Sequence, residues 1–173
     1  TRTVIDRHGR GQHLLDLLAL DAGEQLVRQG LREVEKSGTG AQVAADLSEY
    51  AGLLGRVYKQ RFVLTPDDKD QLVKATEQYR TQYKSKFRYW HGINVVALLA
   101  RQEREAVADV GSEVASLAQK VLDEVSEIIA EGKDDPWAVA TASEACLALK
   151  RCDDAELWLY RLFHHPGTRP FHL

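Results

Sequence analysis

Apolar residues recur at helical spacing along most of the chain, and no stretch keeps the strict alternation that is typical of a strand. The clearest case runs from Val107 to Ile128, where apolar residues step by three or four positions. This spacing predicts one long amphipathic helix. Gly132 should end it, because glycine readily adopts the left-handed backbone conformation that closes a helix.

Helical spacing over the whole chain predicts eight helices in four hairpins. At two predicted starts a capping residue precedes proline: Thr65 before Pro66, and the aspartates 134–135 before Pro136. The predicted ranges are 9–20 and 22–37, 41–63 and 66–87, 89–102 and 103–131, and 135–149 and 153–164.

An up-and-down bundle around one core is the alternative arrangement for these helices. The repeat spacing favours a solenoid instead. Leu54, Gly55 and Tyr58 have the Leu-Gly-x-x-Tyr spacing of a first tetratricopeptide helix. Ala75 and Tyr79 supply the small residue and the aromatic of the second helix.

The last hairpin shows the same spacing without an insertion. Ser143 is its small residue, Ala155 follows twelve positions later, and Leu159 takes the aromatic position. The sequence therefore predicts an all-α fold, a right-handed α-solenoid of about four tetratricopeptide-like hairpins that bury their faces on one another. Its predicted core contains Leu54, Tyr58, Tyr79, Leu98, Val121 and Trp137.

The composition indicates the general class of protein. The 173 residues are 44% apolar and 28% charged, which fits a single soluble helical-repeat domain over 1–173. The weakest repeat match is the first hairpin, within 1–40, and the tail 164–173 should lead toward a further hairpin. Because the chain has no methionine, we expect it to be a processed product or a piece of a longer protein.

Charge and hydropathy exclude several partners. A net charge of −3 gives no general attraction to nucleic acid or to acidic membranes. The longest apolar run, 95–100, is too short to span a membrane, and the first residues lack the apolar stretch of a signal peptide. Cys146 and Cys152 do not form a disulfide framework, so we expect two reduced thiols in a cytoplasmic protein.

Three short runs between residues 52 and 100 carry a family resemblance. In order they are Gly55-Arg56-Val57-Tyr58-Lys59, Tyr79-Arg80, and Gly92-Ile93-Asn94 with Leu98-Leu99. The stretch resembles the TRAF-binding, tetratricopeptide-like regulatory region of the apoptosis signal-regulating kinases, and 134–149 is similar to the next helix of bacterial relatives. The resemblance implies a regulatory module attached to a kinase, protease or other effector domain in a signalling or defence protein.

A polar residue in an apolar helix suggests where such a module would bind. Asn94 lies three positions before Ala97, which in the repeat register turns it toward the inner face of the solenoid. Equivalent positions predict a mostly positive groove, suited to a peptide carboxylate or an acidic segment. The predicted groove residues are Arg56, Lys59, His91, Asn94, Arg101 and Glu144. Alternatively, Asn94 bonds the backbone of a neighbouring helix and only fixes the register, which is the commoner role of a buried polar residue.

Catalytic, metal and cofactor chemistry find little support. The chain has no Gly-rich phosphate loop and no nucleophile motif. His164, His165 and His172 lack the spacing of a metal site, and His91 has no obvious nucleophile, so a packed or groove role is expected for it. The aromatic and basic residues of 79–91 are expected to pack rather than to bind single strands.

These observations predict a non-catalytic interaction module without a cofactor. Its partner would be a protein or peptide, and its exposed solenoid ends could self-associate. Two other functions compete with this one: a sensor that binds a small molecule or nucleotide, and an enzyme that uses a groove histidine or cysteine.

Overall fold

The computed structural model describes residues 2–85, 89–133 and 135–169, and for residues 2–12, 84 and 85 it describes the backbone alone. Within these ranges the chain forms seven α-helices and no strand, which confirms the all-α class and fits a tetratricopeptide-like helical-repeat solenoid. The right-handed sense stays a prediction. Contacts divide the chain into two compact units, 1–78 and 79–173.

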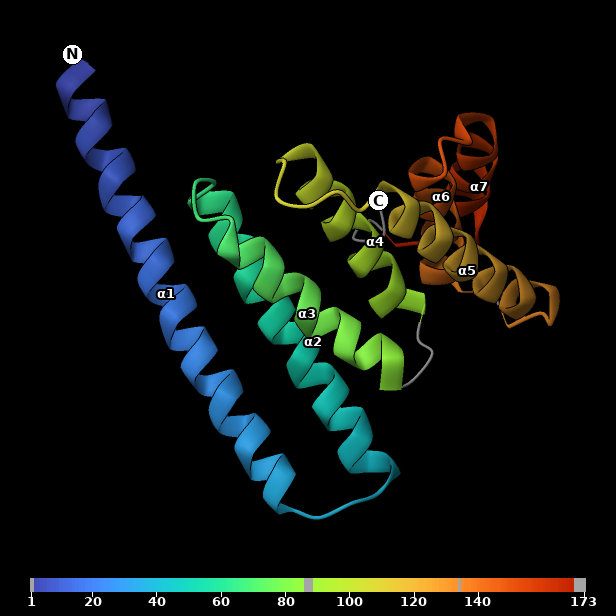
Figure 1. Cartoon of the computed structure of the whole chain (residues 1–173), viewed down its shortest axis with the longest axis horizontal. Coiled ribbons are helices and arrows are strands. Elements are labelled where there is room, and N and C mark those ends of the chain that lie inside the picture. The colour runs from blue at the N-terminus through green and yellow to red at the C-terminus, as the bar shows by residue number, and fades with distance from the viewer. Residues whose placement is uncertain (1, 86–88, 134, 170–173) are drawn as a thin grey trace. The chain divides into compact units, whose positions relative to one another are not determined.

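Unit 1 is built on a long antiparallel hairpin. Helix α1 (Arg2–Lys36) and helix α2 (Ala41–Leu64) pack side by side and are joined by a turn at 37–40 (Figure 1). Gly38 and Gly40 have φ of 107° and 153°, which side chains rarely allow. The hairpin is close at Gly30, where an added Cβ would lie 2.5 Å from the ring of Tyr50.

An ion cluster joins the two helices of this hairpin. The carboxylate of Glu24 on α1 accepts hydrogen bonds from Arg28 Nε at 2.7 Å and from the Tyr58 hydroxyl at 2.9 Å. It also pairs with Arg61 of α2, which reaches Asp21 at 2.7 Å. Partial burial alone would raise the pKa of Glu24, but these hydrogen bonds outweigh it and lower the pKa from 4.5 to about 2.

Helix α3 (Asp70–Ser85) carries the boundary between the units, after Gln78. Its first half belongs to unit 1, where Leu72 and Ala75 are fully buried. Its second half belongs to unit 2, where Tyr79 is 1% exposed and meets Trp90 edge-on at 6.4 Å between ring centroids.

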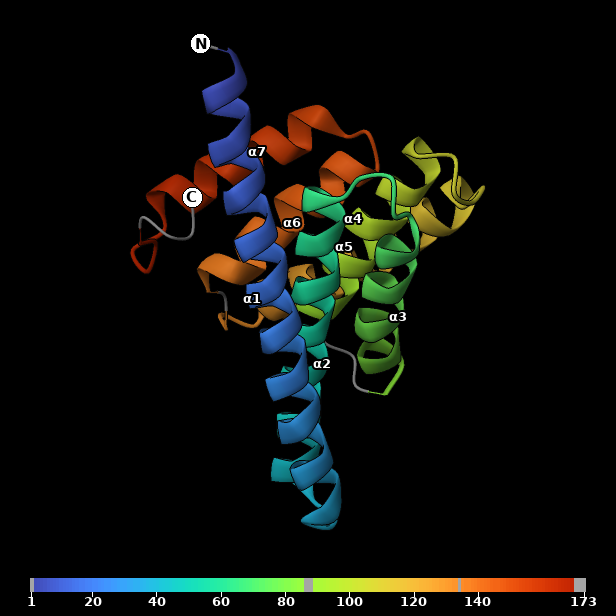
Figure 2. The ribbon, with the colours of Figure 1, turned by 90° about the vertical axis from the view of Figure 1, so that its left-hand side faces the viewer.

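Unit 2 continues with four more helices: α4 (Tyr89–Arg104), α5 (Gly111–Ala130), α6 (Pro136–Ala148) and α7 (Cys152–His164). Each packs on the next, and α6 also packs on α4 (Figure 2). Helix α6 therefore contacts both helices of the preceding hairpin, as expected for stacked repeats. The Ser143 hydroxyl donates to the Ala155 carbonyl at 2.9 Å, so the two small positions of the last predicted repeat do meet.

Two predicted helix boundaries inside unit 1 are wrong. The first predicted hairpin is one continuous helix, because 21–22 contains no proline and Asp21 pairs with Arg61 instead of capping a new helix. Thr65 does not begin α3 but ends α2, since its hydroxyl and its amide both donate to the Arg61 carbonyl at 2.7 Å. Helix α3 begins at Asp70, four residues later than predicted.

The long helix predicted over 103–131 is also interrupted. Helix α4 runs on to Arg104, and α5 begins at Gly111. Between them Ala106 takes a left-handed φ of 54°, and the Val107 amide donates to the Gln102 carbonyl at 2.9 Å. This is a Schellman-type helix end built without glycine.

Other predicted ends and most of the predicted core are confirmed. Gly132 follows α5 with a φ of 72°, and Asp135 caps α6 by accepting from the Ala138 amide at 2.8 Å. Five of the six predicted core residues are buried: Leu54, Tyr58, Tyr79, Leu98 and Val121.

Trp137 was predicted in the core, and this is wrong. Its side chain is 52% exposed. The core face of α6 carries small residues, with Ala138, Ala142 and Ala145 at 0% exposure, so the helices approach too closely to admit an indole ring. Leu159, predicted at the aromatic position of the last repeat, is 43% exposed.

Candidate functional site

The six predicted groove residues do not lie in one compact unit. Arg56 and Lys59 belong to unit 1 and the other four to unit 2. Both cations are exposed on α2, three positions apart and thus on one side of the helix. Tyr58 between them turns inward to Glu24, which fixes the direction of its exposed neighbours.

Asn94 lies on a stripe of α4 that also carries Trp90, Ala97 and Arg101, at helical spacing. Its side-chain amide donates to the Trp90 carbonyl one turn earlier, at 2.7 Å. The alternative, a bond to the backbone of a neighbouring helix, stays a prediction, and the bond described here lies within α4. It orients the amide along the stripe, half-buried.

His91 lies in the interior of unit 2, at 0% exposure. Its ring stacks on Trp90 with centroids 3.6 Å apart and lies 5.9 Å from the ring of Tyr79. The packed role expected as one alternative for this histidine is therefore the one that its burial supports.

Arg101 and Glu144 contribute charges from α4 and α6, two helices that pack together. Arg101 pairs at 2.5 Å with Glu105, the residue just after α4, which reduces the positive character of this side. Glu144 is exposed, and Trp137 lies two turns before it on the exposed side of α6. The repeat pattern could not identify Trp137 as a surface residue, because an indole was taken for core.

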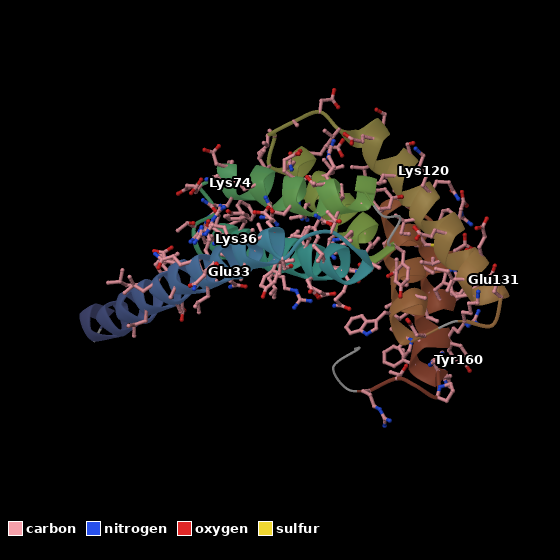
Figure 3. All side chains as sticks on the ribbon, turned by 90° about the horizontal axis from the view of Figure 1, so that it is seen from below. Glu33, Lys36, Lys74, Lys120, Glu131 and Tyr160 are labelled. Carbon is pink, nitrogen blue, oxygen red and sulfur yellow. The ribbon has the colours of Figure 1, made fainter. Side chains whose placement is uncertain are left out.

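A second feature lies at the end of α7, in residues that were expected to be a tail. A surface pocket of about 460 Å³ is lined by Tyr160, Arg161, His164, His165 and Pro166. The Tyr160 side chain projects from this end of unit 2 (Figure 3) and stacks against His164 at 4.1 Å. The segment after α7 is ordered as far as it is described, since Thr168 donates to the Leu162 carbonyl at 2.6 Å.

The pocket has a defined hydrogen-bonding character. Arg161 lies 5.3 Å over the ring of Trp158, which holds its guanidinium near the surface. His165 Nδ1 accepts from the Gly167 amide at 3.0 Å, so a neutral ring carries its proton on Nε2. A guanidinium, imidazoles and a tyrosine ring can bind a planar group that carries negative charge.

Metal binding, disulfide bonding and membrane insertion find little support among the described residues. Among the residues that the structure describes, no three His, Cys, Asp or Glu side chains lie close enough to hold a metal ion. His172, part of the histidine set examined in the sequence, lies outside the described residues. Both cysteines are free, Cys146 buried and Cys152 exposed. None of the described helices has the length and apolar character needed to cross a membrane.

Comparison with known proteins adds one match. The family model described as Tetratricopeptide Repeats-Sensor matches residues 6–99, more than half of the chain, which covers most of α1, all of α2 and α3, and most of α4. No curated protein and no solved structure matches. The all-helical fold, the buried repeat positions of α2 and α3, and this match agree. The chain belongs to the Tetratricopeptide Repeats-Sensor family.

Proposed function

We propose that the chain is a non-catalytic interaction module that controls an effector domain attached to it in a longer protein. The observation that carries this proposal is the family match over stacked helices whose exposed sides present charged and aromatic residues. Tetratricopeptide-like repeats act through such surfaces, because a rigid row of helices holds side chains ready for a partner.

The finer proposal is a role like that of the TRAF-binding region of the apoptosis signal-regulating kinases. The ordered motifs around Gly55, Tyr79 and Gly92 support it. In this role the module would hold an adaptor or the effector itself, and a cytoplasmic location would follow.

Arg56 and Lys59 are proposed to contact an acidic segment of the partner. Both are exposed on one side of α2, and a peptide carboxylate matches their charge. Within unit 2, Asn94 and Arg101 on α4 and Glu144 on α6 are proposed to supply separate polar contacts to the partner. Acidic peptides should then bind more tightly at low salt than at high salt.

The test is fluorescence anisotropy with labelled octapeptides of glutamate and of lysine. We expect the glutamate peptide to bind, and Arg56→Ala with Lys59→Ala to weaken it about tenfold, since a lost charge-assisted bond costs about 1.5–3 kcal/mol. Asn94→Ala should weaken it less. Lys120→Ala, an exposed cation on α5, is the control and should bind as the wild type does. Equal loss in the control, or no preference for the acidic peptide, contradicts the assignment.

The pocket at the end of α7 favours a second function, a sensor of a small ligand. Its guanidinium and aromatic rings suit an aryl phosphate or a related planar anion. Phenyl phosphate should raise the melting temperature of the wild type and not of Arg161→Ala. An unchanged melting temperature of the wild type rejects the sensor function at this pocket.

A further inference from the structure

Three helices of unit 2 meet closely at the first turn of α4. A Cβ added to Gly92 would lie 2.6 Å from Val121 Cγ2 on α5 and 2.9 Å from Tyr83 Cε2 on α3. Only glycine fits between these two side chains. Glu124 follows Val121 by three positions on α5, so it reaches the same junction from the same side of the helix.

The carboxylate of Glu124 is only partly hydrogen-bonded at this junction. Its carboxylate accepts the backbone N–H of Tyr89, the first residue of α4, whose amide has no partner within the helix. Its Oε2 atom is buried and has no hydrogen-bond partner in the described part of the chain. A buried carboxylate oxygen in this position is costly while it carries negative charge.

The described neighbours of Glu124 do not compensate this charge. The titratable groups that interact with it among the described residues are Tyr83 from α3, Tyr89 from α4 and Glu127 from its own helix. None of these three carries a positive charge. The Tyr89 hydroxyl is itself turned to the Asp135 carboxylate, at 3.4 Å.

Protonation of Glu124 lowers the free-energy cost of burying its carboxyl group. Burial raises the pKa of Glu124, the Tyr89 amide opposes this, and the charge of Glu127 adds to it, so that the pKa lies at about 7 instead of 4.5. Burial likewise raises the pKa of Tyr83 to about 12, with the Glu124 charge as a second cause. Both hydroxyls facing Glu124 are therefore neutral wherever it titrates.

We propose that Glu124 is a proton-operated latch: its protonated form closes the junction of α3, α4 and α5, and loss of the proton loosens the first turn of α4. The ligand sensed by this device is the proton itself. The inference goes beyond the interaction function, because it needs no partner and gives a role to Glu124, which is not one of the predicted groove residues. A module of a sensor family would thereby change its structure in response to pH near neutrality.

The direction follows from the raised pKa. The folded state holds this proton more tightly than the unfolded chain, so the stabilisation is complete below pH 4.5 and is lost as the pH rises through 7. Hydrogen exchange at the first turn of α4, corrected for the intrinsic pH dependence of exchange, reports this loss locally.

The experiment compares the full chain with Glu124→Gln between pH 5.5 and 8.5. In the wild type, protection of the amides of 93–95, which have partners within the first turns of α4, should fall about tenfold, a value reduced for solvent screening. In Glu124→Gln, which keeps the shape and has no proton to lose, protection should stay constant. Glu127→Gln is the matched control and should keep the pH dependence with a lower midpoint.

A wild-type profile that is flat, or one that Glu124→Gln reproduces, overturns the proposal. If Glu124→Gln does not fold, the carboxyl ¹³C signal of Glu124 in the wild type decides instead. A midpoint near 7 supports the latch, and a midpoint near 4.5 overturns it. Neither result depends on the peptide-binding function.

Discussion

Tyr58, which the repeat pattern singled out, acts with both parts of its side chain. Its ring is buried at 3% exposure, and its hydroxyl donates to Glu24. The pattern predicted the ring, because a gap between helices needs an aromatic at that spacing. It could not predict Glu24, since a charged residue on a different helix, 34 positions away, leaves no periodic signal.

Replacing Glu24 by Gln should destabilise unit 1 in a pH-dependent manner. The lowered pKa means that the stabilisation is present above pH 4.5 and is lost as the pH falls toward 2. We expect a loss of about 1–2 kcal/mol at pH 7 after solvent screening is allowed for. Urea denaturation at pH 7, 4 and 3 measures the difference in free energy of unfolding between variant and wild type.

The control for this prediction is Glu33→Gln. Glu33 pairs only with Lys36 at 3.0 Å in the contacts described, and both are more than 60% exposed (Figure 3). Such a pair contributes little, so the control should match the wild type at every pH. If the loss of unfolding free energy in Glu24→Gln stays the same from pH 7 to 3, the loss comes from packing and not from charge.

Glycines give a second pair of predictions at the residue scale. Gly92→Ala should destabilise the chain by about 2 kcal/mol, because its Cβ would meet Val121 and Tyr83. Gly23→Ala, in the interior of α1 with nothing within 4 Å, should stabilise it by about 0.5–1 kcal/mol. Thermal unfolding of both variants measures the opposite signs, and equal signs would contradict the close contact at Gly92.

At the scale of elements, helix ends decide what could be predicted. Three helices end with a residue of positive φ and the same Schellman-type bonds: Ala106 after α4, Gly132 after α5 and Lys150 after α6. Only Gly132 carries a signal that a sequence reader can use. Ala106 and Lys150 carry no such signal, so the residues between α4 and α5 were predicted as part of a helix over 103–131.

Ala106→Gly should therefore stabilise the chain by about 0.5–1 kcal/mol, because it relieves a left-handed conformation that Cβ disfavours. Ala97→Gly, at an exposed interior position of α4, is the control. It should destabilise by a similar amount, since glycine costs about 1 kcal/mol in a helix interior. Chemical denaturation of the two variants should give shifts of opposite sign.

The candidate site was less predictable than the fold. Arg56, Lys59 and Glu144 are exposed, but helical spacing decides only which side of each helix is exposed, so the shared inner face predicted for them stays a prediction. Helical spacing could not decide whether the side chains of His91 and Trp137 are buried or exposed, since histidine and tryptophan occur both in cores and on surfaces. The pocket after α7 depends on turn geometry at 165–168, which leaves no pattern in the sequence.

At the scale of the whole molecule, the last helix presents an uncovered apolar side. Large side chains on α7 are exposed by 69% at Leu157, 65% at Tyr160 and 56% at Phe163. We expect weak self-association through this side of α7, because exposed apolar side chains gathered on one helix favour association. Sedimentation velocity over a hundredfold range of concentration should show it, and Phe163→Glu should abolish it. A wild type that sediments as a monomer throughout would contradict this prediction.

The turn at 37–40 has a consequence for engineering. Gly38 and Gly40 point into open space, with nothing within 4 Å of an added Cβ, and the turn links two helices that are already locked together by the Glu24 cluster. Foreign sequence is tolerated where few contacts are broken and where loop closure adds little entropy. A short epitope or a fluorescent label inserted between Gly38 and Gly40 should leave both helices in place. The protein then offers a labelling point that lies outside the residues of both proposed binding surfaces, usable in the same experiments that test them.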